Sequence, residues 1–142
     1  MRRPIRTRTA VALVAAGLAL VPLASACTSS NAKAPSDVVA ELGEVTDMTS
    51  QKEVTIEVVD NSYAPKVTKV APGTKVTFRN TGANPHNVTP FDDGVFEPIV
   101  VGPGEAKDLI VPQKTGDLPY YCTIHGGKSS GQRGALVIAN PF

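Results

Sequence analysis

The sequence predicts an all-β fold, an antiparallel β-sandwich, from three observations. From residue 51 onward, apolar and polar side chains alternate in short runs, which is the period of a half-buried strand. Glycine and proline, twelve of each in the chain, separate these runs at short intervals. No segment of this part has the 3.6-residue period of an amphipathic helix. Several short strands separated in this way are typical of two packed sheets.

The expected strands can be placed by alternation and by turn residues. Ala71, Pro72 and Gly73 mark a turn between two of them. The strands cover, in chain order, residues 52–59, 66–70, 74–80, 86–89, 105–111, 118–123 and 135–139. Side chains that share the inward face of a strand are two residues apart. On this basis the residues expected in the core are Val54, Ile56, Val58, Val76 and Phe78.

The N-terminus has the features of an export signal. Four arginines between residues 2 and 8 precede an apolar run over 10–23, which is too short to cross a bilayer comfortably. Small residues at 24–26 complete the pattern, so we expect 1–26 to be a signal peptide. We expect 27–50 to form a largely disordered tether, in which 37–48 have apolar residues for one short helix or loose packing. The single folded domain is then 51–142.

Cys27 leaves two routes of export open. Residues 24–26 form an A-x-A site for ordinary secretion. The segment from Leu23 to Cys27 instead resembles the lipobox of bacterial lipoproteins, with the leucine one place early. We favour lipidation, because an exposed free thiol on an exported protein oxidises or pairs; a disulfide between Cys27 and Cys122 is a further alternative. Lipidation would hold the protein on the outer face of the cell membrane, whereas ordinary secretion would leave it soluble, in the periplasm or outside the cell.

Charge argues against one class of partner. Loss of residues 1–26 would remove four of the 14 basic residues and none of the 13 acidic ones, which leaves a net charge of −3. A chain of this charge is a poor candidate for binding nucleic acid. Nothing in the sequence has the pattern of a substrate pocket with a general base, so we expect no enzymatic activity. We expect a monomer that contacts a membrane only through its lipid.

The strongest functional signal comes from His86, Cys122 and His125. They include both histidines of the chain and one of its two cysteines, and the last two form a Cys-x-x-His pair. One thiolate and two imidazoles suit copper that cycles between Cu(I) and Cu(II). Taken alone, His86 is readily interpreted as a loop histidine and Cys122 as a small buried apolar residue. Their order along a β-rich chain favours one shared copper site at a pole of the sandwich.

The sequence around these residues resembles the cupredoxins, the plastocyanin and amicyanin group of blue copper proteins. The resemblance rests on NPHNV at 84–88, YYCTIH at 120–125 and PGTKVTFRN at 72–80. It covers about residues 52–139 and implies a Greek-key, cupredoxin-like sandwich with one type 1-like copper ion. It also implies that His86 and His125 ligate copper through imidazole nitrogen and Cys122 through its thiolate.

The resemblance assigns a supporting role to Asn87. Its side chain would bond near Thr123, and its backbone N–H would reach the sulfur of Cys122. Hydrogen bonds of this kind orient ligands and tune the metal.

The axial ligand departs from the family pattern. The two usual places of the axial methionine hold Lys128 and Ser130. Gln132 is the candidate replacement, because an amide oxygen also serves as an axial ligand in copper sites. A solvated amide in the polar, glycine-rich loop 126–134 is the simpler interpretation of Gln132. We expect an oxygen donor at this position rather than a thioether.

The resemblance implies a single-electron carrier that docks transiently with redox partner proteins near His125. Gly126 and Gly127 would leave that pole flat and uncharged. The alternative is an envelope protein that binds or delivers copper without an electron-transfer role, which the missing methionine and the polar loop favour. A third interpretation is an adhesion module that has lost its metal, and the intact set of two histidines and one cysteine argues against it.

Mass spectrometry of the mature N-terminus tests the expected anchor. We expect the protein to begin at Cys27, to carry the mass of the attached acyl chains and to fractionate with membranes, because acyl chains partition into the bilayer. Cys27→Ser should abolish both signatures, and Thr28→Ser should leave them intact. An unmodified Cys27 on a soluble secreted protein would contradict the prediction.

Overall fold

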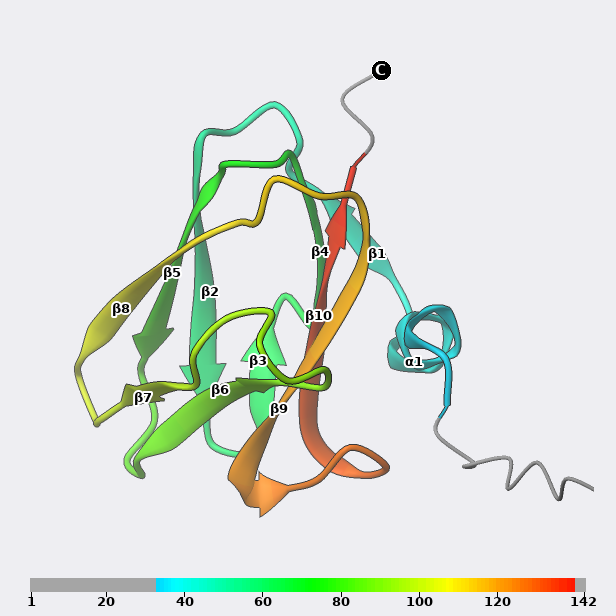
Figure 1. Cartoon of the computed structure of the whole chain (residues 1–142). Coiled ribbons are helices and arrows are strands. Elements are labelled where there is room, and N and C mark those ends of the chain that lie inside the picture. The colour runs from blue at the N-terminus through cyan, green and yellow to red at the C-terminus, as the bar shows by residue number, and fades with distance from the viewer. Residues whose placement is uncertain (1–32, 140–142) are drawn as a thin grey trace, which may run out of the picture. The chain divides into compact units, whose positions relative to one another are not determined.

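A computed structural model describes residues 33–139 and shows a sandwich of two β-sheets (Figure 1). The signal peptide predicted over 1–26 and Cys27, with its lipidation or disulfide, lie outside the described residues. No helix within the described part is long and apolar enough to cross a bilayer. The elements are α1 (Pro35–Leu42), β1 (Val45–Asp47), β2 (Glu53–Val59), β3 (Ser62–Ala64), β4 (Val67–Val70), β5 (Lys75–Asn80), β6 (His86–Pro90), β7 (Ile99–Val101), β8 (Ala106–Ile110), β9 (Gly116–Gly126) and β10 (Gly131–Ile138).

The predicted all-β sandwich is confirmed, and its sheets are mixed rather than antiparallel throughout. One sheet has the strand order β1-β4-β10-β9-β6-β7 and the other has β3-β2-β5-β8. β4 pairs in parallel with both β1 and β10, and β2 pairs in parallel with β5. The parallel pair β2–β5 arises because the chain leaves this sheet after β3, adds β4 to the other sheet and then returns. Alternation cannot predict such crossings, since it reports only which face of a strand is buried.

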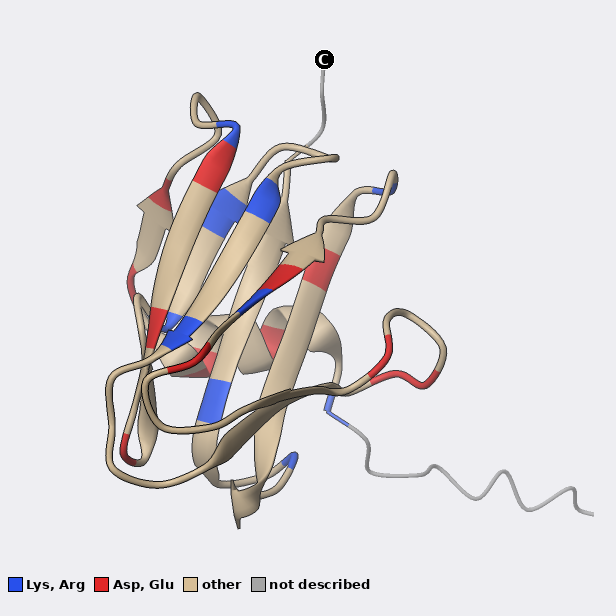
Figure 2. Ribbon diagram, turned by 90° about the vertical axis from the view of Figure 1, so that its left-hand side faces the viewer, with Lys and Arg blue, Asp and Glu red and all other residues tan. Residues whose placement is uncertain are grey.

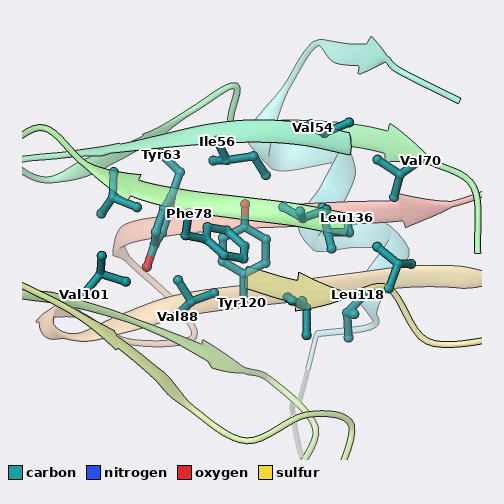
Figure 3. Close-up of a cluster of buried hydrophobic side chains, with 14 of the residues drawn as sticks. Val54, Ile56, Tyr63, Val70, Phe78, Val88, Val101, Leu118, Tyr120 and Leu136 are labelled. Carbon is teal, nitrogen blue, oxygen red and sulfur yellow. The ribbon is translucent and has the colours of Figure 1, made fainter. Parts of the chain in front are cut away.

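Side chains from both sheets meet in one apolar core (Figure 3). Three aromatic rings pack edge to face at its centre, where the ring of Tyr120 lies 4.9 Å from that of Tyr63 and 5.5 Å from that of Phe78. Such pairs add about 0.5–1.5 kcal/mol beyond the area they bury. The residues predicted from alternation are all buried: Val54, Ile56, Val58, Val76 and Phe78. Leu118, Tyr120 and Cys122 of β9 belong to this core, so the core packs against the strand that carries the candidate ligand Cys122.

Within the described residues, regular secondary structure begins before the predicted start of the domain at residue 51. α1 starts at Pro35, where the missing N–H costs no helix hydrogen bond, and it is followed by Gly43 with φ of 101°. β1 pairs with β4 and so belongs to the six-stranded sheet. Within the stretch 27–50, where one short helix or loose packing was expected over 37–48, the structure has α1 over Pro35–Leu42 and β1 over Val45–Asp47. The three residues of β1 are too few to show a strand period, which is why the sequence pattern missed them.

α1 is fastened to the sandwich by apolar packing and by an ion pair. Val38 is fully buried, and the helix packs against β9 and β10. Glu41 accepts a hydrogen bond from Arg133 Nη2 at 2.9 Å and another from Lys33 Nζ at 2.6 Å. The bond from Arg133, followed by that from Lys33, lowers the pKa of Glu41 from 4.5 to about 2. Because the folded-state pKa is the lower one, this contribution to stability is present above about pH 4.5 and is lost as the pH falls toward 2.

The outer surface of the strands carries interspersed charges of both signs (Figure 2). On the four-stranded sheet, Lys75 pairs with Glu53 at 2.8 Å. On the other sheet, Lys69 pairs with Asp47 at 3.5 Å. Exposed pairs of this kind contribute little to stability.

Candidate metal centre

Two neighbouring strands bring the three candidate ligands together. β6 begins at His86, and β9 carries Cys122 and His125 close to its end, which lies at the bottom of Figure 1. The strands pair antiparallel, with Thr89 opposite Tyr121. His86 and Cys122 are fully buried, whereas His125 is partly exposed. The site therefore lies just below the surface at one end of the sandwich.

The ligand atoms converge on one point. The Nδ1 atoms of His86 and His125 lie 3.9 Å and 3.7 Å from the sulfur of Cys122. One ligand atom from each residue lies within 4.8 Å of the others. The two imidazole rings are 4.6 Å apart and tilted by 45°. His86, Cys122 and His125 are thus positioned to hold one metal ion.

Asn87 holds β6 and β9 at this spacing. Its backbone N–H donates to the sulfur of Cys122 at 3.5 Å. Its side-chain amide donates to Thr123 Oγ1 at 2.7 Å, and its Oδ1 accepts from the backbone N–H of Thr123 at 2.9 Å. Tyr63, from the opposite sheet, donates its hydroxyl to the Asn87 carbonyl at 2.5 Å. These are the contacts that the resemblance assigned to Asn87 and Thr123.

Gln132 lies inside the sandwich and not in a solvated loop. It is the second residue of β10, and it is fully buried. Its amide nitrogen donates to the backbone carbonyls of Ser62 at 3.0 Å and Val59 at 3.3 Å. Both hydrogens are therefore engaged, and Oε1 faces the site, 2.8 Å from His86 Nδ1. The interpretation of Gln132 as a solvated loop amide is wrong.

The glycines around Gln132 explain the error. Gly126 and Gly131 face each other where β9 and β10 pair in a hairpin. A Cβ atom on Gly126 would lie 2.6 Å from the Ser130 carbonyl oxygen, and one on Gly131 would lie 2.5 Å from that of His125. Glycine is required here so that the two strands can approach closely. In the sequence the same residues had suggested a flexible, polar loop.

Asp60 is a site residue that sequence reasoning missed. Its Oδ1 lies 3.2 Å from His86 Nε2, the other nitrogen of the imidazole. A carboxylate only accepts hydrogen bonds, so in the tautomer with the proton on Nε2 His86 donates to Asp60 and its Nδ1 is free to bind a metal. The hydrogen bond from His86, followed by that from the side chain of Asn84, lowers the pKa of Asp60. Asp60 lies 26 residues before His86, in the turn between β2 and β3. Because an Asp-Asn pair is common in turns of any kind, the sequence carries no signal for its role at the site.

The fold and this cluster define a β-sandwich metalloprotein with a buried site of two histidines and one cysteine. The model of the cupredoxin-like domain family matches residues 17–138, and the chain belongs to this family. The resemblance predicted from the sequence is thereby confirmed.

Individual relatives are consistent with this assignment. Plastocyanin A/B of Petroselinum crispum is 29% identical over 87 residues, which are 54% of this chain and 86% of that protein. Plastocyanin of Cucumis sativus is 28% identical over 90 residues, 54% of this chain and 87% of the relative. Among solved structures, a reduced amicyanin variant superposes with a TM-score of 0.53 and 26% identity, over 62% of this chain and 83% of the amicyanin.

A copper enzyme is also among the structural neighbours. The Cu-containing nitrite reductase of Thermus scotoductus SA-01 has a TM-score of 0.52 and 28% identity, over 63% of this chain. The chain spans only 23% of that enzyme. A purple cupredoxin of Nitrosopumilus maritimus, at 20% identity and a TM-score of 0.52, is covered over 99% of its length and supports the fold alone.

Asn87→Ala tests the connection between β6 and β9. We expect the free energy of unfolding of the metal-free domain to fall by about 1–3 kcal/mol, because two side-chain hydrogen bonds to Thr123 are lost at about 1 kcal/mol each. Denaturant unfolding measures the change. Gln113→Ala is the control, since Gln113 is exposed and lies outside the site. Equal stability of the two variants would show that Asn87 does not connect the strands.

Proposed function

We propose that the chain binds one copper ion through His86 Nδ1, Cys122 Sγ and His125 Nδ1 and carries single electrons. The observation that supports this most directly is the convergence of one thiolate and two imidazoles in the buried end of a cupredoxin-like sandwich. This donor set suits both Cu(I) and Cu(II), and copper bound there would supply reversible one-electron exchange.

The protein contributes rigidity to this function. His86 and Cys122 lie on paired strands, and the bonds of Asn87 join those strands beside the sulfur. Tyr63 supports Asn87 from the opposite sheet. A ligand frame that is held from several sides need not rearrange when the charge of the metal changes. This arrangement favours fast electron exchange over substrate chemistry.

His125 provides the route to a partner protein. It is partly exposed, and its neighbour Ile124 is 53% exposed. Between residues 118 and 132 the single side chain of Lys, Arg, Asp or Glu is Lys128. An exposed apolar side chain in a region of low charge suits transient docking of a redox partner. We propose this end of the molecule as the docking surface for redox partners. We also propose that the chain has no enzymatic activity, as the role of an electron carrier implies.

The alternative role in copper delivery loses part of its support. It was drawn from the polar sequence of residues 126–134, which suggested an open loop around the metal. β9 and β10 instead pair up to Gly126 and Gly131, and Gln132 is buried. A closed, preorganised site favours a resident ion over one that is handed on.

We also propose Gln132 Oε1 as the axial ligand. Oε1 and His86 Nδ1 lie 2.8 Å apart, and when Nε2 of His86 holds the ring proton both atoms present lone pairs. Two acceptors at this distance repel each other unless a proton or a metal ion lies between them. The bonds from the Gln132 amide nitrogen to Val59 and Ser62 prevent Oε1 from turning away. Coordination by both atoms to one copper ion resolves this conflict.

The location we propose is the outer face of the cell membrane, with Cys27 acylated and a monomeric domain beyond it. The support is the basic and apolar start of the chain followed by the lipobox-like segment.

Cys122→Ala is the direct test of the copper site. Copper-loaded protein without residues 1–26 should show an intense thiolate-to-copper charge-transfer band, and the substitution should abolish it because the thiolate is removed. Visible and EPR spectra measure this. Ile124→Ala, two residues away, is the control and should keep the band. An unchanged spectrum of Cys122→Ala would mean that copper binds elsewhere.

Gln132→Met tests the axial ligand. An amide oxygen is a harder donor than a thioether and favours Cu(II), so the reduction potential should rise. A tenfold change in the relative affinity for the two oxidation states corresponds to about 59 mV, and we expect a rise of at least about this size. The symmetry of the EPR signal should change as well.

The control for this substitution is Gln113→Met, at an exposed glutamine outside the site. Its potential and EPR signal should equal those of the unmodified protein. If Gln132→Met changes neither property, Gln132 is not a ligand and the axial position is vacant or holds water.

A further inference from the structure

We infer that Asp60 is a positioning and tuning residue of the redox site. Through His86 it stabilises Cu(II) relative to Cu(I) and holds the reduction potential down. This inference rests on the proposed function of a copper-based electron carrier. The carboxylate belongs to the turn between β2 and β3, in the sheet opposite to that of the ligands.

The carboxylate of Asp60 is held by contacts with residues that precede and include His86. Besides His86 Nε2 at 3.2 Å, its Oδ1 accepts the backbone N–H of Asn84 at 3.4 Å. A Cβ atom at Gly82 would lie 2.5 Å from the same oxygen, so the lack of a side chain there leaves room for the carboxylate. Asn61 has φ of 67°, the left-handed conformation that asparagine tolerates in turns. Residues of the single segment 82–86 therefore contact or leave room for one carboxylate oxygen.

A negative charge behind the imidazole acts on the metal-facing nitrogen. A carboxylate that accepts the Nε2 proton fixes the ring orientation and makes Nδ1 a stronger donor. The stronger donor and the negative charge both favour the more highly charged metal ion, which is Cu(II). The side chain of Asp60 is 42% exposed, so solvent weakens the long-range charge effect. The hydrogen bond to the buried imidazole is direct, and its effect on Nδ1 remains.

The same turn also holds the candidate axial ligand. The backbone carbonyls of Val59 and Ser62, on either side of Asp60 and Asn61, accept the amide hydrogens of Gln132. Three of the four consecutive residues 59–62 thus contact two groups that face the metal. Asp60 contacts His86, a ligand of the proposed site, and the two carbonyls contact Gln132, the proposed axial ligand. We therefore assign the tuning to the turn and its charge to Asp60.

The reduction potential of Asp60→Asn tests the inference. Asparagine keeps an oxygen acceptor but removes the charge, so the fold and the charge-transfer band should persist. We expect the affinity for Cu(II) to fall about tenfold more than that for Cu(I), since partners of ligating histidines typically change metal affinity by about 10–100-fold. This corresponds to a rise of about 59 mV. Asp117→Asn is the matched control, because Asp117 lies five residues before Cys122 on β9, about 16 Å away, and should leave the potential unchanged.

A second variant tests the inference in case Asp60→Asn destabilises the fold. Gly82→Ala keeps the charge but places a Cβ atom where the carboxylate lies, so it should also raise the potential. An unchanged potential in Asp60→Asn overturns the inference. An equal rise in Asp60→Asn and Asp117→Asn also overturns it, because the net charge alone would then explain the change.

Zn(II) binding separates this inference from the proposed function. If the unmodified protein with copper gives no charge-transfer band and no reversible couple, the proposed electron carrier is wrong. The action of Asp60 on His86 is then decided by titration with Zn(II), which has no redox chemistry. About tenfold weaker binding in Asp60→Asn than in Asp117→Asn supports it, and equal binding overturns it.

Discussion

The pairing of β6 with β9 is the interaction on which the site depends. His86 and Cys122 are 36 residues apart in the chain, and the antiparallel register that sets Thr89 against Tyr121 brings them together. Successive side chains of a strand point to opposite faces, so a slip of one residue would turn His86 away from the sulfur. Asn87 is bonded to Thr123 and Cys122 and therefore holds the register at the point where it matters.

The site also depends on the packing of the two sheets. Tyr63 lies in the core against Tyr120, and its hydroxyl donates to the carbonyl of Asn87. The buried imidazole of His86 lies between Asp60 and Gln132, which come from different sheets. A buried polar group without partners costs roughly 1–3 kcal/mol, so the imidazole needs such neighbours. The same polar contacts thus stabilise the apoprotein and orient the ligands.

Much of the fold and the three metal-binding candidates could be predicted from the sequence, because strand alternation and the Cys-x-x-His spacing can be recognised in the sequence itself. Alternation located β2 and β5 and their buried faces, and the spacing of the Cys-x-x-His pair with His86 located the metal centre. The short strands β1, β3 and β7 have three residues each, too few for a period to appear. The parallel pairing of β2 with β5 results from a crossing between sheets, which no local pattern records.

The polar partners of the ligands escaped prediction for a related reason. Asp60 had the appearance of a turn residue, and Gln132 that of a loop residue. Both acquire their role only because the turn from the end of β2 to the start of β3 lies beside the start of β6 and of β10. Side chains that act through a tertiary contact leave no spacing in the sequence, in contrast to Cys122 and His125, which lie three residues apart on one strand.

The turn of residues 59–62 therefore links two influences on the metal that would otherwise be independent. Asp60 makes His86 a stronger donor, and the carbonyls of Val59 and Ser62 direct Gln132 Oε1 at the same point. Both influences favour Cu(II), because one adds negative charge and the other supplies a hard oxygen. Groups that share a backbone segment do not act additively, since moving one moves the other. The reduction potential is then a property of this turn and its packing against β6 and β10, and not of the three ligands alone.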